Sequence, residues 1–232
     1  AFQLQRRFVS DAAHELRTPL ASVKTAVTHS LSGKRSISQY KELTILLSQR
    51  LEALENLIND LLFLSRADES KSSNSQHIDL SQILELISEA FTPLFQDKNI
   101  HFTMHTTNNL YIMSEQKPLL RLLGNLLENA AKNTPSGGTV ILTASTDSQH
   151  VKIEISDTGT GIAQEHLPHI FERFYHVQNG EKDEGTGLGL SICQSIVTTH
   201  NGQITAESEL GHGSIFTVIF PVVPASIPNN NK

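Results

Sequence analysis

A long stripe of aliphatic side chains in the first third of the sequence most restricts what this chain can fold into. Its members recur three or four residues apart, the spacing of one face of an α-helix: Leu43, Leu47, Leu51, Leu54, Ile58 and Leu61. Further leucines at 46, 57 and 62 widen the stripe beyond what one partner helix could cover. The sequence therefore predicts a helix over 38–66 that packs against more than one neighbour.

A second helical pattern precedes this stripe and contains a proline. Apolar residues from Leu4 to Val27 keep helical spacing, which predicts a helix over 1–31. Pro19 lies inside it, where proline removes a hydrogen bond and costs about 3 kcal/mol, so we expect a kink. Two such helices joined by a short loop form a hairpin, and two hairpins form a dimeric four-helix bundle. A monomer whose hairpin packs on the rest of the chain is the alternative.

Beyond residue 66 the character of the sequence changes. The polar, serine-rich segment 67–78 predicts a linker and hinge, and 224–232, rich in Pro and Asn, predicts a disordered tail. Between them we expect helices over 80–95, 115–133 and 188–200 and strands over 100–104, 111–113, 139–145, 151–156, 203–207 and 215–220. Mixed elements of this kind predict a sheet with helices on one face. The expected fold class is α+β in two domains, the hairpin over 1–66 and an α/β sandwich over 79–223.

Composition narrows the classes of partner and compartment. The net charge is -6 and no run of four basic residues occurs, which argues against nucleic acid as a partner. No stretch of 18 apolar residues occurs, so we expect no membrane span in this fragment. The single Cys193 fits a cytoplasmic fragment and lies in an apolar run, where buried packing is expected. Because the sequence starts inside a helical pattern, a membrane anchor elsewhere in a longer protein stays open.

The kinked helix carries a histidine whose neighbours could make it reactive. His14 and Thr18 are four residues apart and share a helical face, and Glu15 adjoins the histidine. A carboxylate that keeps one imidazole nitrogen protonated leaves the other as a nucleophile. An ordinary surface histidine is the commoner explanation for such a residue alone. Here, however, the apolar pattern continues past Pro19, so the proline is not a simple helix end.

Three blocks in the second half could bind a nucleotide. Asn125, Asn129 and Lys132 share one face of an expected helix, where an amide oxygen suits Mg²⁺ and an ammonium suits phosphate. An exposed polar face is the alternative. Asp157 follows an expected strand and could accept a hydrogen bond from adenine, and the glycines after it let the backbone approach a planar base. These are Gly159 and Gly161, and an ordinary turn is their alternative.

The third block opens the last expected helix, where free N–H groups can bind phosphate. Its residues are Gly185, Thr186, Gly187, Leu188 and Gly189, with a flexible hinge as the alternative. Before it, Phe171, Phe174 and Tyr175 stand beside the polar span 178–184, a pattern that predicts a lid over a bound ligand. An ordinary amphipathic turn followed by a surface loop is the alternative.

The stretch His14 to Leu20, His-Glu-Leu-Arg-Thr-Pro-Leu, resembles the phosphoacceptor box of two-component sensor histidine kinases. The later blocks resemble, in order, the N, G1, F and G2 boxes of their catalytic domain, which belongs to the histidine-kinase/gyrase-type ATPase superfamily. The resemblance implies a homodimer that binds ATP and Mg²⁺. It also implies that His14 is phosphorylated, with Glu15 as its acid/base partner and Thr18 orienting water during dephosphorylation. The partner it implies is the receiver domain of a response regulator.

The resemblance also assigns roles in the nucleotide site. It implies that Asn129 is the Mg²⁺ ligand, that Asn125 and Lys132 lie beside the phosphates and that Asp157 reads adenine. It implies that the phosphate seat is lined by Gly185, Gly187 and Gly189.

Two positions depart from the family pattern. Asn133 stands where many relatives have an aromatic residue, and His176 stands where many have arginine. They lend some weight to a catalytically inactive dimeric scaffold as a second possible function. An ATP-hydrolysing conformational machine of the same superfamily is another. The box around His14 argues against the machine, because such a protein has no use for it. Intact Asn129 and Asp157 argue against the scaffold.

Overall fold

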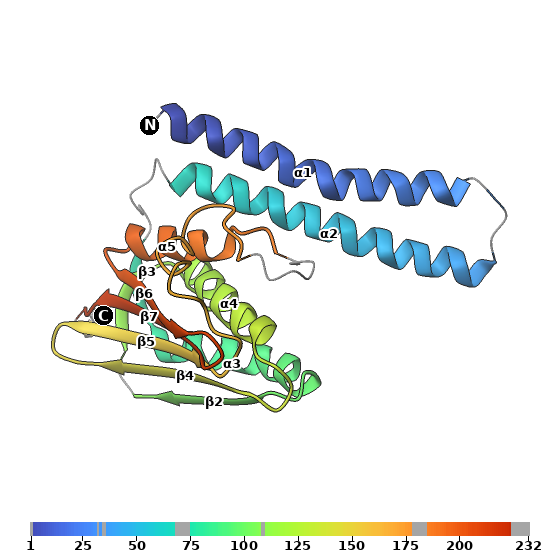
Figure 1. Ribbon diagram of the computed structural model, residues 1–232. Coiled ribbons are helices and arrows are strands. Elements are labelled where there is room, and N and C mark those ends of the chain that lie inside the picture. Colours follow the sequence, from blue (N-terminus) through green and yellow to red (C-terminus); the bar gives the residue numbers. More distant parts are fainter. Residues whose placement is uncertain are drawn as a thin grey trace, which may run out of the picture.

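The computed structural model describes residues 2–31, 33, 36–67, 75–107, 110–177 and 185–223 (Figure 1). The expected tail, the span 178–184 of the expected lid and residues 68–74 of the expected linker lie outside the described residues. Every helix and strand predicted from the sequence is present, with its ends displaced by two residues at most, which is the usual uncertainty at an element's ends.

Two long helices form the predicted hairpin, α1 (Phe2–Leu31) and α2 (Ile37–Ala67). They run side by side (Figure 1). Helix α1 continues through Pro19 to Leu31, and Figure 1 shows its direction changing near its middle. The proline therefore bends the helix instead of ending it, because the apolar pattern on both sides keeps the helix packed on α2.

Much of the apolar surface of the hairpin has no partner within one chain. Exposed hydrophobic side chains on the two helices are Val9, Leu20, Val27, Leu31, Ile37, Tyr40, Ile45, Leu46, Leu51, Ile58 and Leu62. Leu57 and Leu64 are buried, because this end of α2 packs against the second domain. The hairpin thus contacts the rest of the chain at one end and leaves a broad apolar face open along its length.

The second domain is a five-stranded sheet with three helices on one face (Figure 1). The strand order is β2-β4-β5-β7-β6, with β2 and β4 parallel and the other pairs antiparallel. The strands are β2 (His101–Thr106), β4 (Thr139–Thr146), β5 (His150–Asp157), β6 (Gln203–Glu209) and β7 (Gly213–Pro221). The helices are α3 (Leu80–Asp97), α4 (Gln116–Asn133) and α5 (Gly189–Thr199). The architecture agrees with the predicted α+β fold class of a hairpin followed by an α/β sandwich.

A short two-stranded sheet precedes α3 and corrects the expected linker. Strand β1 (Gln76–Asp79) pairs antiparallel with β3 (Tyr111–Ser114), so the prediction that a linker extends to residue 78 is wrong from Gln76 onward. Its residue Ile78 is buried. The strand ends on Asp79, whose Oδ1 accepts a hydrogen bond from the N–H of Ser81 at 3.0 Å and caps the start of α3.

The position of α4 follows from its two faces. Five leucines of α4 are almost completely buried, at helical spacing: Leu119, Leu122, Leu123, Leu126 and Leu127. With this face fixed in the core, Asn125, Asn129 and Lys132 lie on a face that is less buried. Cys193 on α5 packs against the same core, and its Sγ lies 3.7 Å from the carbonyl oxygen of Leu122. The expectation of a buried cysteine is therefore confirmed.

Candidate active site

The polar face of α4 meets the glycine block at the start of α5. The side-chain Nδ2 of Asn125 donates a hydrogen bond to the carbonyl oxygen of Gly189 at 3.1 Å. A Cβ placed on Gly185 would lie 3.4 Å from the Nζ of Lys132. Two segments about 60 residues apart in sequence thus form one site. An ammonium lies beside the glycine block that leads into α5, and such a group suits phosphate.

The glycine block is held by the segment that precedes it. Gly187 has a φ of +64°, and a Cβ there would lie 2.6 Å from the backbone carbon of Phe174 and 2.8 Å from Nε2 of His176. The N–H of Phe174 donates to the carbonyl oxygen of Gly187 at 2.9 Å. Only glycine fits this conformation and this space. Within the block, Oγ1 of Thr186 accepts from the N–H of Leu188 at 3.4 Å, so the chain turns directly into α5.

The carboxylate of Asp157 ends β5 in a buried position. Its residue is 4 % exposed, and its Oδ1 accepts a hydrogen bond from the N–H of Gly159 at 2.8 Å. Burial raises the pKa of Asp157, and hydrogen bonds from the backbone of Gly159 and Ser214 oppose that rise. A buried carboxylate of this kind is suited to accept from a neutral donor such as the amino group of a base. Gly161, at a φ of +67°, has no room for a side chain, which would collide with the carbonyl oxygen of Glu209.

The residues around His14 lie on α1, which also contacts the second domain. His14 is exposed, Glu15 is half-buried, and Oγ1 of Thr18 donates to the carbonyl oxygen of His14 at 3.4 Å. Six residues before His14, Phe8 contacts the second domain: the centroid of its ring lies 6.0 Å from that of Phe174. The segment that holds the glycine block therefore also contacts the helix that carries His14.

A second contact between the domains was not predicted from the sequence. Arg121 on α4 forms an ion pair with Asp60 on α2, and its guanidinium carbon lies 4.5 Å from the centroid of the Phe63 ring. Burial raises the pKa of Asp60 more than the charge and hydrogen bond of Arg121 lower it. No local pattern could reveal this pair, because its members are separated by 61 residues and belong to different domains.

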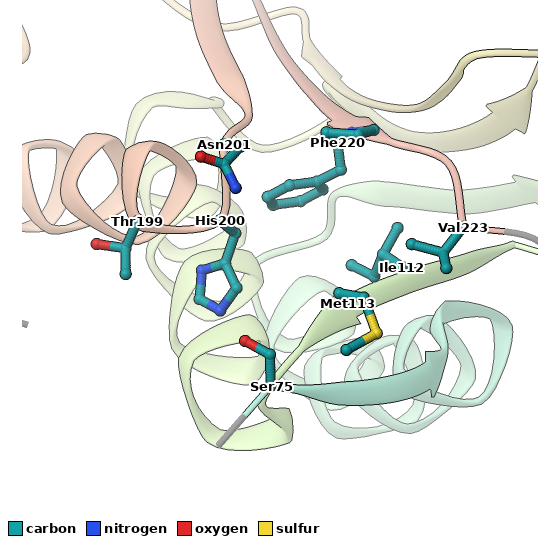
Figure 2. Close-up of a pocket in the computed structure, with 9 residues that line it drawn as sticks. Ser75, Ile112, Met113, Thr199, His200, Asn201, Phe220 and Val223 are labelled. Atoms are coloured by element: carbon teal, nitrogen blue, oxygen red, sulfur yellow. The ribbon is translucent and has the colours of Figure 1, made fainter. Parts of the chain in front are cut away.

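One cavity of the described part of the chain lies away from these residues. Its volume is about 500 Å³, and Figure 2 shows its lining at the end of α5 and beside β3 and β7. The lining residues are Ser75, Ile112, Met113, Thr199, His200, Asn201, Phe220, Pro221 and Val223. None of the site residues predicted from the sequence is among them. The chemistry of the side chains, and not cavity size, therefore locates the candidate nucleotide site.

The donor set around α4 fits a nucleotide and a hard cation. The site contains a buried carboxylate suited to the base and an amide oxygen suited to Mg²⁺. It also contains an ammonium and helix N–H groups suited to the phosphates.

Within the described ranges there is no cluster of three or more His, Cys, Asp or Glu side chains that could hold a metal. Among the described helices, none combines the length and the apolar character needed to cross a bilayer.

Comparison with known families assigns both domains. Residues 4–70 match the His Kinase A (phospho-acceptor) domain, and residues 114–224 match the histidine kinase-, DNA gyrase B-, and HSP90-like ATPase domain. The first match covers most of the hairpin and the second most of the sandwich, in the predicted order. A histidine phosphoacceptor hairpin joined to an ATPase domain defines the class of protein. This chain belongs to the sensor histidine kinases, as the resemblance of its motifs predicted.

Individual relatives agree with this assignment. The chain is 36 % identical over 232 residues to the sensor histidine kinase RppB of Synechocystis sp., covering 98 % of this chain and 51 % of RppB. A crystal structure of full-length ShkA with AMPPNP has a TM-score of 0.71 and 27 % identity, covering 94 % of this chain and 46 % of ShkA. The fold is also that of ThkA crystallised with the response regulator TrrA, at a TM-score of 0.76 and 21 % identity over 97 % of this chain and 64 % of ThkA. The chain spans about half the length of the curated relatives it matches.

Proposed function

We propose that this chain autophosphorylates on His14 from Mg-ATP and passes the phosphoryl group to an aspartate of a response-regulator receiver domain. The observation that carries the proposal is the junction of α4 with the glycine block, where Asn125 bonds Gly189 and Lys132 adjoins Gly185. This junction offers binding groups for the phosphates of a nucleotide, and the buried Asp157 offers one for its base. The phosphoacceptor-domain match over 4–70 adds a group to receive the phosphate.

Each residue of the nucleotide site has one task in this proposal. Asp157 accepts a hydrogen bond from the adenine amino group, and the close backbone at Gly159 and Gly161 leaves room for the flat base. Asn129 supplies an amide oxygen to Mg²⁺, while Asn125 and Lys132 lie beside the phosphates. The phosphate seat consists of Gly185, Thr186, Gly187, Leu188 and Gly189. Bound ATP would supply the phosphoryl group, and Mg²⁺ would neutralise the charge of the phosphates. Positioning these groups is therefore the main task of the protein.

The phosphoacceptor residues act on α1. A nitrogen of His14 forms the new P–N bond while the bond from the γ-phosphorus to the bridging oxygen breaks and ADP leaves. Glu15 keeps the other imidazole nitrogen protonated and removes the proton as the phosphohistidine forms. Thr18, on the same helical face, orients the water that hydrolyses the phosphorylated partner. The exposed position of His14 agrees with a group that both the ATP-binding domain and the receiver domain of a response regulator must reach.

The open apolar face of the hairpin supports a homodimer. Leu51, Ile58 and Leu62 are each at least 42 % exposed in one chain, and a second hairpin would cover them in a four-helix bundle. The receiver domain of a response regulator docks on this bundle, and the complex of ThkA with TrrA supports that class of partner. Because ATP is the phosphate donor, we assign this fragment to the cytoplasm. An anchor in the membrane would belong to the part of the protein outside this fragment.

One labelling experiment tests the proposal. The protein is incubated with γ-labelled ATP and Mg²⁺, and we expect protein-bound label that is lost in acid and retained in base. His14→Gln should abolish it, whereas His29→Gln, on the same helix, should leave it unchanged. Wild type that binds ATP without being labelled would instead favour the inactive scaffold. Steady phosphate release without label would favour the ATP-driven machine.

A further inference from the structure

The last residue of α4, Asn133, contacts both halves of the nucleotide site. Its Nδ2 donates to Oδ1 of Asn129 at 3.0 Å and to the carbonyl oxygen of Asn129 at 2.8 Å. Its own carbonyl oxygen accepts from the N–H of Thr160 at 3.1 Å. That carbonyl also lies 2.5 Å from where a Cβ of Gly159 would stand. The side chain of Asn133 thus reaches the amide of Asn129, while its backbone reaches the loop after Asp157.

The side-chain contact fixes which way the amide of Asn129 faces. An amide presents an oxygen on one side and an NH₂ group on the other, and only the oxygen can bind a cation. If the Asn129 amide turned over, its NH₂ would face the NH₂ of Asn133, and two donors would oppose each other. The hydrogen bond at 3.0 Å therefore holds Oδ1 in place and uses one of its two lone pairs. The second lone pair stays available for Mg²⁺.

We infer that Asn133 is a positioning residue that preorganises Asn129 for Mg²⁺, and that it does so through its side chain alone. The inference rests on the proposed function, since it assigns a role within the same site. Because the bond to Thr160 uses the backbone of Asn133, changing the side chain leaves the loop after Asp157 attached. Substitution of Asn133 should therefore weaken binding of Mg²⁺ while leaving binding of the adenine base largely unchanged.

The test compares nucleotide affinity with and without metal. ADP binding is measured by calorimetry in excess Mg²⁺ and in EDTA. The dissociation constant in EDTA divided by that in Mg²⁺ reports how much the metal strengthens binding. Asn133→Leu has the same number and branching of side-chain heavy atoms and no hydrogen-bond donor. We expect it to reduce this ratio about tenfold, as is common when a group that orients a metal ligand is removed. Affinity in EDTA should change less than threefold, because the loop after Asp157 remains in place.

Two further variants separate positioning from helix stability. Asn133→Gln keeps an NH₂ group and should recover much of the Mg²⁺ effect. Thr92→Val is the matched control, because Oγ1 of Thr92 donates to the carbonyl oxygen of Ser88 at 2.8 Å, again four residues back on a helix. It should lower the melting temperature without changing the ratio.

Three outcomes would overturn the inference while leaving the proposed function intact. The first is an unchanged ratio in Asn133→Leu. The second is an increased ratio in Asn133→Leu, which would mean that Asn133 competes with Mg²⁺ for Oδ1 of Asn129. The third is a decrease of the ratio in Thr92→Val as large as that in Asn133→Leu. Failure of the wild type to bind ADP at all would count against the proposed function instead.

Discussion

The contact between α2 and α4 should be far more sensitive to loss of its cation than to loss of its anion. The side chains of Arg121 and Asp60 are 26 % and 24 % exposed, so the pair is largely removed from water. For Asp60, burial outweighs the attraction of Arg121 and raises the pKa. The carboxylate therefore gains little from the pair, whereas the guanidinium also rests on the ring of Phe63 at 4.5 Å.

Removing the cation leaves the charge of Asp60 without compensation, and a second carboxylate, that of Glu128, is within its electrostatic influence. The pKa of Glu128 on α4 is raised by burial and by the charge of Asp60. Arg121→Met should therefore weaken docking of the second domain on α2 by about 2 kcal/mol, between the values for exposed and fully buried pairs. This corresponds to about a 30-fold change in the ratio of docked to undocked forms. Asp60→Asn keeps an acceptor for Arg121 and should cost less than about 1 kcal/mol.

The pH dependence has a definite sign. A carboxyl group whose pKa is raised in the docked form contributes stability at low pH and loses it as the pH rises through that pKa. In Arg121→Met the carboxyl of Asp60 loses both interactions that lowered its pKa. In this variant, docking of the second domain on α2 should therefore recover when the pH is lowered from 8 to about 5, because the carboxyl of Asp60 becomes protonated. Asp60→Asn should show less of this recovery.

Docking can be followed by energy transfer between two dyes. One dye is attached to an introduced surface cysteine on α2 and the other to one on α3, and labelled chains are diluted into excess unlabelled protein so that only pairs within one chain are seen. The native Cys193 does not interfere, because burial raises its pKa to about 12. Equal losses of transfer in Arg121→Met and Asp60→Asn, or a larger loss in Asp60→Asn, would refute the reasoning.

Three other substitutions or reactions have defined outcomes. Asp157→Asn should weaken ADP binding at least about tenfold at pH 7.5. Without nucleotide it should unfold in heat no earlier than wild type, and wild type should lose stability relative to it as the pH rises through the raised pKa of Asp157. Gly161→Ala should lower the free energy of unfolding in urea by more than about 3 kcal/mol, because the new Cβ collides with the carbonyl oxygen of Glu209. Gly137→Ala is the control: its φ is +84° but nothing lies within 4 Å of the new Cβ, so it should cost about 1–2 kcal/mol. Cys193 should not react with a maleimide at pH 8 until urea unfolds the protein, because burial raises its pKa to about 12.

The helices and the main sheet could be predicted because their signals are local. The leucines of α2 and α4 repeat every three or four residues, and the strands of the sheet alternate between buried and half-buried positions. Strand β1 was missed because Ile78 is the sole apolar residue in Gln76–Asp79. What makes this segment a strand is its pairing with β3, which begins at Tyr111. No window of a few residues contains that information.

The sequence predicted the residues of the proposed nucleotide site, but not the contacts between them. The spacing of Asn125 and Lys132 placed them on one face of a helix, but not the bond from Asn125 to Gly189 that joins this face to α5. Such contacts depend on how the elements pack. The same holds for Asn133, which the sequence marks as a departure from the family, while the contacts of its side chain are visible only in the fold.

The second domain contacts both helices of the hairpin, and this double attachment has a mechanical consequence. It contacts α1 where Phe8 meets Phe174, and it contacts α2 where Asp60 meets Arg121. Helix α4 carries Arg121 one turn before Asn125, so the attachment to α2 and the polar face share one helix with a buried leucine core. A sliding of α1 along α2 cannot preserve both attachments, because packed helices move as rigid elements. Such a shift must release the second domain from one helix, and only release from α1 lets the proposed nucleotide residues move relative to His14, because His14 and Phe8 are both on α1.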